Sequence, residues 1–73
     1  MKTTNIAKVY AGFYSIEVGN ASFAVYKRFD SWWFGHPKND EGKRAIKMLA
    51  DINCNIQTLK DGKEAVQKLA SIF

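Results

Sequence analysis

The chain of 73 residues contains only one cysteine, one histidine and one proline. Because a disulfide needs two cysteines, none can form within the chain, and its stability must come from packing. Structural zinc usually takes four cysteine or histidine ligands, so the sequence predicts no metal site and indicates no cofactor. Cys54 and His36 make one nucleophile–base pair conceivable, but nothing in their spacing supports it. We therefore expect a protein that is not an enzyme.

Long apolar runs and glycine-rich loops are also missing. No segment approaches the length of a membrane-spanning helix, and residues 1–5 lead into no signal-like apolar run. The glycines are scattered along the chain, so no phosphate-binding loop is expected. These absences predict a cytoplasmic protein with no membrane partner.

Size and charge set the remaining bounds. A chain of 73 residues makes one domain, residues 1–73, with little room for a buried site in addition to its core. Aromatic residues make up 14% of the sequence and give that small core large side chains to bury. The formal net charge of +4 suits contact with nucleic acid or with an acidic protein surface, and it does not choose between them.

Two short turns organise the first half of the chain into a sheet. Gly19-Asn20 lies between two apolar runs, a pattern that favours a two-residue hairpin turn. Asp30-Ser31 can turn the chain a second time. The sequence therefore predicts an antiparallel meander with strands over residues 6–18, 21–29 and 32–34. Within the long first strand, Ala11-Gly12 indicates a bulge or bend.

These turns assign each strand residue to one of two faces, because side chains alternate along a strand. The first turn pairs Phe13 with Tyr26, and the second pairs Arg28 with Trp33. The face predicted as the core carries Tyr14, Ile16, Val18, Phe23, Val25, Phe29, Trp32 and Phe34. The outer face carries Phe13, Ser15, Glu17, Ser22, Ala24, Tyr26, Arg28 and Trp33.

The second half of the chain has a helical period. Asn39 or Asp40 can cap a first helix whose apolar residues recur at helical spacing: Ala45, Ile46, Leu49 and Ile52. Residues 53–55 break this helix, and Ile56-Gln57 is either a short extended link or a fourth, edge strand. Thr58 begins a second helix, with an apolar stripe of Leu59, Gly62, Val66, Leu69 and Phe73. The predicted fold is a small α+β domain: a three- or four-stranded antiparallel β-meander packed on one face by one or two C-terminal helices.

Gly62 lies on the apolar stripe of the second helix, where it lowers helix propensity by about 1 kcal/mol relative to alanine. This position suggests a close approach between helix and sheet. A looser first turn that starts at Asp61 is the alternative.

Four residues of the outer face carry the functional signal. Phe13, Tyr26 and Trp33 place aromatic rings beside Arg28, a combination that a merely solvated face does not need. Such rings can stack unpaired bases while Arg28 and Lys8 meet phosphate, as in a single-stranded nucleic-acid-binding module. The same residues suit a protein partner, because tryptophan, tyrosine and arginine dominate interface hot spots. A purely structural alternative stacks Trp33 on Arg28 and covers the other rings with another segment of the chain.

A second basic cluster lies on the first predicted helix and consists of Lys43, Arg44 and Lys47. Such a run is either a solvated helix face or a rim of positive charge that accelerates binding to an acidic or nucleic-acid partner. We include these residues among the candidates for partner binding.

The order and turn chemistry of the segments resemble those of short proteins encoded by phages and mobile elements. The resemblance is carried by residues 12–18 (GFYSIEV), residues 22–27 (SFAVYK), the Trp32-Trp33 pair and residues 58–65 (TLKDGKEA). Several anti-CRISPR and other host-takeover proteins are similar in size and layout. The resemblance implies a non-enzymatic inhibitor that occludes a surface of a host protein or nucleoprotein complex. Nucleic-acid mimics tend to be acidic, whereas this chain is basic, so steric blocking or contact with nucleic acid is the implied mechanism.

Overall fold

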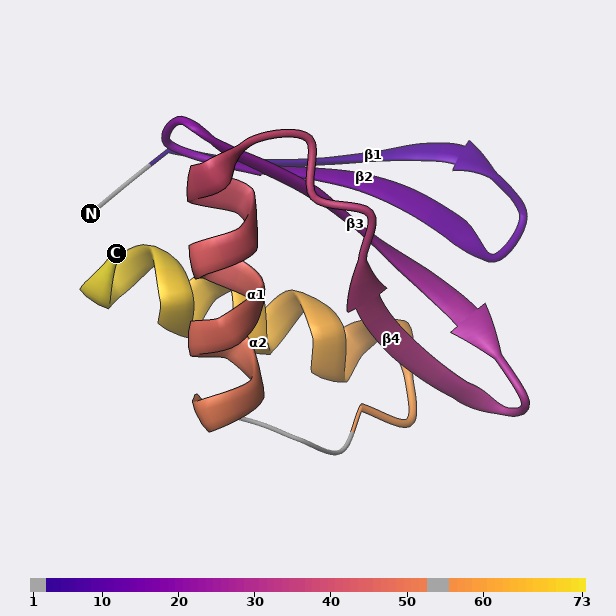
Figure 1. Ribbon diagram of the computed structural model, residues 1–73. Coiled ribbons are helices and arrows are strands. Elements are labelled where there is room, and N and C mark those ends of the chain that lie inside the picture. The colour runs from indigo at the N-terminus through magenta and orange to yellow at the C-terminus, as the bar shows by residue number, and fades with distance from the viewer. Residues whose placement is uncertain (1–2, 53–55) are drawn as a thin grey trace.

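A computed structural model describes residues 3–52 and 56–73. The elements follow in the order β1 (Thr4–Tyr10), β2 (Phe13–Val18), β3 (Ala21–Arg28), β4 (Ser31–Gly35), α1 (Asp40–Ile52) and α2 (Leu59–Ile72). The strands form one antiparallel sheet in the order β1-β2-β3-β4. Figure 1 shows the two hairpin tips, between β1 and β2 and between β3 and β4, extending beyond the helices. The predicted α+β meander with C-terminal helices is confirmed.

The fourth strand comes from the N-terminal segment and not from Ile56-Gln57. Gly12, at a φ of 82°, helps to reverse the chain after Tyr10, so the predicted long first strand is in fact a hairpin. Glycine adopts this left-handed conformation without the steric cost that a Cβ brings. Ile56 nevertheless contacts the opposite edge of the sheet, because its backbone oxygen accepts a hydrogen bond from Trp32 N–H at 2.9 Å.

The register between β2 and β3 is as predicted, with Phe13 opposite Tyr26. The next turn contains Phe29-Asp30 rather than Asp30-Ser31, and Trp33 consequently lies opposite Tyr26. This displaces the predicted pairing by two residues. Because the side-chain period of a strand is two, Trp33 keeps its predicted place on the outer face.

The core lies between the inner face of the sheet and both helices. Its fully buried large side chains are Ile16, Val18, Phe23, Val25, Leu49, Val66 and Leu69. Tyr14, Trp32 and Phe34 are partly buried and pack against this cluster, as predicted. Phe29 was also predicted in the core, but its side chain is 85% exposed because it lies in the β3–β4 turn.

Asn39 caps α1 and joins the helix to the β2–β3 turn. Its Oδ1 accepts a hydrogen bond from Gly42 N–H at 2.7 Å, and its Nδ2 donates to the backbone oxygen of Asn20 at 2.8 Å. Gly42 is buried against β3, where an added Cβ would overlap the backbone oxygen of Ser22. The first turn of α1 therefore lies too close to β3 for any side chain at position 42.

Thr58 caps α2, since its hydroxyl accepts a hydrogen bond from Asp61 N–H at 3.2 Å. Gly62 is buried on this helix, but a Cβ there would make ordinary contact with Ile56 Cγ2 at 3.6 Å. The same Cβ would lie 3.9 Å from Val25 Cγ2 on β3, so the helix does approach the sheet at Gly62, but the approach at Gly42 is closer. The predicted break at residues 53–55 lies outside the described part of the chain.

Candidate protein-binding surface

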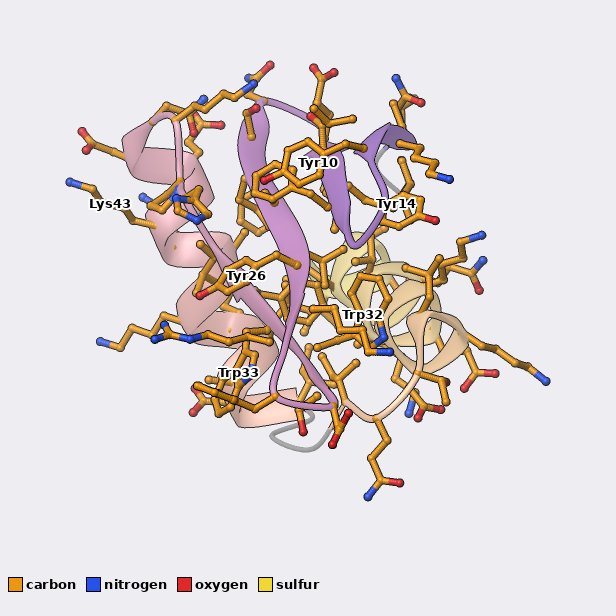
Figure 2. The ribbon with its side chains drawn as sticks, turned by 90° about the vertical axis from the view of Figure 1, so that its right-hand side faces the viewer. Tyr10, Tyr14, Tyr26, Trp32, Trp33 and Lys43 are labelled. Atoms are coloured by element: carbon orange, nitrogen blue, oxygen red, sulfur yellow. The ribbon has the colours of Figure 1, made fainter. Side chains whose placement is uncertain are left out.

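Aromatic side chains from all strands meet on the outer face of the sheet, which is turned away from the core. We call Tyr10, Phe13, Tyr26, Trp33 and His36 the aromatic surface. The ring centroids of Tyr10 and Phe13 are 5.0 Å apart, and those of Phe13 and Tyr26 are 6.4 Å apart, both pairs being stacked. The His36 ring lies 5.6 Å from Phe13 and 5.1 Å from Tyr26. In Figure 2, Tyr10, Tyr26 and Trp33 follow one another on one side of the sheet, whereas Tyr14 and Trp32 lie on the side nearer α2.

A β-bulge brings Tyr10 into the aromatic surface. Lys8 pairs with Tyr14, but the register then shifts and Tyr10 pairs with Phe13. Without the extra residue Val9, Tyr10 would share the inner face with Lys8, because alternate residues of a strand face the same side. Bulges commonly redirect a side chain in this way.

His36 reaches the aromatic surface through an unusual backbone conformation. Its φ is 52°, and Pro37 follows it. A positive φ is uncommon for residues other than glycine, and a residue before proline is restricted further. Conformations of this kind cost about 1–3 kcal/mol and persist only where their surroundings hold them. The surroundings of His36 include the rings of Phe13 and Tyr26, which its own ring contacts.

Two further contacts fix rings of this surface. The Tyr26 ring lies over Gly35, where an added Cβ would be 2.9 Å from Tyr26 Cε1. Trp33 Nε1 donates a hydrogen bond to the backbone oxygen of Arg28 at 3.3 Å. Both rings are therefore oriented before any partner binds, which lowers the conformational entropy lost on binding.

An open hollow lies at the end of this surface, beside the β3–β4 turn. We call it the hairpin notch, and Tyr26, Arg28, Phe29 and Trp33 line it. Its volume is about 240 Å³. The guanidinium carbon of Arg28 lies 5.3 Å from the centre of the Phe29 ring, a cation–π distance. Arg28 thus lies over Phe29, and not over Trp33 as the structural alternative supposed.

Charge on the outer face is sparse. By the strand register this face carries Glu17 on β2 and Arg28 on β3. Lys8, which the sequence suggested as a phosphate contact, lies opposite an inner-face residue, and so does Lys27. The aromatic surface is therefore mainly apolar, with one arginine at the hairpin notch.

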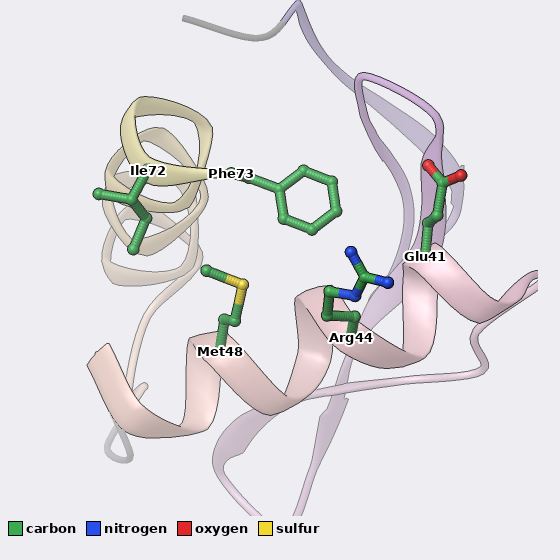
Figure 3. A pocket seen from close by; sticks show the side chains of 5 residues that line it. All are labelled: Glu41, Arg44, Met48, Ile72 and Phe73. Atoms are coloured by element: carbon green, nitrogen blue, oxygen red, sulfur yellow. The ribbon is translucent and has the colours of Figure 1, made fainter.

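The three basic residues of α1 do not share one environment. Arg44 lines a separate hollow between α1 and the end of α2, together with Glu41, Met48, Ile72 and Phe73 (Figure 3). Lys43 and Lys47 are exposed and lie one helical turn apart. Figure 2 shows Lys43 projecting from α1 to the left of Tyr26.

Phe13, Tyr26, Arg28 and Trp33 are thus brought together on one face, as the strand alternation predicted. The sequence reasoning missed Tyr10, Phe29 and His36. The predicted first strand, residues 6–18, has 13 residues, whereas strands usually have 3–10. This excess length was the available signal that the segment is a hairpin, which puts Tyr10 on the outer face. No comparable signal marked the left-handed conformations of Phe29 and His36.

Within residues 3–52 and 56–73, no three or more histidine, cysteine, aspartate or glutamate side chains gather as they would to hold a metal ion. No helix in this part of the chain is long and apolar enough to cross a membrane. Comparisons with protein-family models, curated proteins and solved structures gave no match to the chain.

Proposed function

We propose that this is a non-enzymatic binding protein that recognises a protein partner through the aromatic surface. The observation that carries the proposal is that large aromatic rings are exposed on the outer face of the sheet, which does not pack on the core. Tyr10 is 61% exposed and Trp33 is 53% exposed, although both residues belong to the sheet. Tyr10 stacks on Phe13, and Trp33 lies opposite Tyr26 on the neighbouring strand. Clusters of exposed apolar side chains on a small domain mark interaction sites.

The charge distribution favours a protein over a nucleic acid. Each phosphate that a protein neutralises needs a lysine or arginine, and nucleic-acid affinity depends on several such contacts. On the outer face of the strands the charged residues are Arg28 and the acidic Glu17, which lies opposite Ser22. Tyrosine and tryptophan at the centre of a patch with little charge are instead typical of protein interfaces.

The resemblance of this layout to that of short phage and mobile-element proteins leads us to propose a host defence complex as the target. In this proposal the protein acts in the host cytoplasm and blocks a surface of a protein or nucleoprotein machine. Its net charge of +4 supports steric occlusion over mimicry of nucleic acid. Lys43 and Lys47 would add positive charge around the contact and accelerate association with an acidic target, whereas Arg44 lines the separate hollow between α1 and α2.

The test begins with capture from bacterial lysate, identification of the captured protein and reconstitution with that purified partner. Tyr10→Ser and Trp33→Ala should each weaken binding at least tenfold, which is about 1.4 kcal/mol. Gln67→Ala is the matched control, because Gln67 is exposed on α2, away from the sheet. Equal affinity of all three variants would refute the aromatic surface as the binding site.

The proposal that the target is a host defence complex needs its own experiment. Bacteria with an active CRISPR system are challenged with phage while expressing the protein or Trp33→Ala at equal levels. The proposal expects that the native protein restores plaque formation and that the variant does not. Unchanged immunity across several defence systems would contradict a role as an inhibitor of them.

Single-stranded nucleic acid is the second candidate partner, and the stacked rings favour it. Tyr10, Phe13 and Tyr26 form a row of ring pairs with interplanar angles of 21°, and bases can extend such a platform. Binding of short oligonucleotides, weakened by salt and lost in Tyr10→Ser, would support this candidate over the first.

A further inference from the structure

Phe29 is placed where the fold gains little from an aromatic ring. Phe29 and Asp30 both have positive φ, 53° and 63°, as the two central residues of the β3–β4 turn. Asparagine and glycine suit such positions, whereas a bulky residue with positive φ is a genuine outlier. The Phe29 side chain is also 85% exposed. Because the sheet has no need for a ring at this point, the strain indicates a role outside the fold.

The hairpin notch around Phe29 is built from parts that are already oriented. The Trp33 indole is hydrogen-bonded to the backbone oxygen of Arg28, and the Tyr26 ring lies against Gly35. The Arg28 guanidinium lies over the Phe29 ring. At about 240 Å³ the notch is smaller than the usual small-molecule pocket, which spans about 300–1,000 Å³. It is therefore of a size for one large side chain rather than for a free metabolite.

The lining defines the chemistry of that side chain. Tyr26, Phe29 and Trp33 offer aromatic surface, which suits an apolar or aromatic group. Arg28 offers a guanidinium, which pairs with carboxylates and phosphates, and in a protein partner the matching group is a carboxylate. A cationic ligand is disfavoured, because Arg28 already lies over the Phe29 ring and would repel it.

We propose that the hairpin notch is the anchor site for an aromatic side chain flanked by aspartate or glutamate in the protein partner. The ring enters between Trp33 and Phe29, and the neighbouring carboxylate pairs with Arg28. This inference rests on the proposed function, because it names the partner chemistry at one end of the aromatic surface. It adds Phe29 to the binding residues, and it favours an acidic protein segment over nucleic acid.

The experiment uses the full chain labelled with nitrogen-15, and it follows the indole N–H resonances of its two tryptophans. The probe is an acetylated Asp-Phe-Glu amide peptide, titrated to millimolar concentration. The Trp33 resonance should shift saturably, whereas that of Trp32 on the inner face should not. Matched peptides replace the phenylalanine by alanine or both acidic residues by lysine, and each should bind at least fivefold more weakly.

Phe29→Asn separates binding from folding, because asparagine suits the positive φ of this turn. Its melting temperature should equal or exceed that of the native chain, while its affinity for the peptide falls at least fivefold. Arg28→Gln keeps the backbone oxygen that holds Trp33 and should lose the preference for acidic flanks. The proposal would be overturned if the Trp33 resonance did not shift on addition of the peptide, or if the lysine-flanked peptide bound as tightly as the acidic one. A shift caused only by oligothymidylate would also overturn it, in favour of nucleic acid.

Affinity for the purified partner distinguishes failure of this inference from failure of the proposed function. If Tyr10→Ser loses binding but Phe29→Asn binds fully, the aromatic surface stands and the notch is not its anchor. If neither substitution weakens binding, the proposed function fails and the notch proposal fails with it.

Discussion

Replacing Gly42 and Gly62 by alanine, one at a time, should change stability in opposite directions. Both glycines are buried on helices, and neither has a positive φ, so alanine strains the backbone at neither position. What differs is the space around them. The Cβ at Gly42 would overlap the backbone oxygen of Ser22, whereas the Cβ at Gly62 would contact Ile56 Cγ2 at 3.6 Å.

For Gly42→Ala, overpacking costs about 1–3 kcal/mol. Moving the first turn of α1 away from β3 also weakens the cap by Asn39, at about 1 kcal/mol. The better helix propensity of alanine offsets about 1 kcal/mol. We therefore expect a net loss of about 1–3 kcal/mol, against a total stability of about 4–11 kcal/mol for 73 residues.

For Gly62→Ala, the propensity gain of about 1 kcal/mol meets no opposing clash, so the melting temperature should rise by about 4–8 °C. The free energy of unfolding of both variants is measured by urea titration, with circular dichroism as the signal. The comparison requires that the free energy depends on urea concentration with the same slope in both variants and in the native chain. A neutral or stabilised Gly42→Ala, or a destabilised Gly62→Ala, would refute the helix–sheet distances on which this reasoning depends.

Three further predictions concern the cap, the last helix and the two tryptophans. Asn39→Ala should cost about 1–2 kcal/mol in urea unfolding, because it removes the cap and the bond to the β2–β3 turn; no loss would contradict those bonds. Truncation before Leu69 should abolish cooperative melting, since Leu69 is fully buried, and an unchanged melting temperature would contradict its place in the core. Trp32→Ala should destabilise the domain by about 2–4 kcal/mol and Trp33→Ala by less than about 1 kcal/mol, because only Trp32 packs on the core; the reverse order in the same assay would contradict the assigned faces.

The parts of the fold that depend on local chemistry were predictable from the sequence. Gly19-Asn20 set the β2–β3 register, and Asn39 and Thr58 marked the starts of both helices. The outer-face position of Trp33 was also predictable even though its turn was misplaced, because a displacement of two residues preserves the face.

The rest depends on conformations that run against local preference. Phe29 has a residue type suited to a strand, and only the pairing of β4 places it in a turn. His36 and Tyr10 join the aromatic surface through a positive φ and a bulge, which side-chain alternation cannot reveal. The sequence therefore predicted the centre of the candidate site but missed residues at both of its ends.

Site-specific photo-crosslinking in bacterial cells tests the central proposal most directly. A benzophenone amino acid is placed at position 31, beside Trp33 on the outer face, or, as a control, at the exposed position 67 on α2. We expect one discrete protein adduct from position 31 and none from position 67. Adducts from position 67 alone would contradict recognition through the aromatic surface.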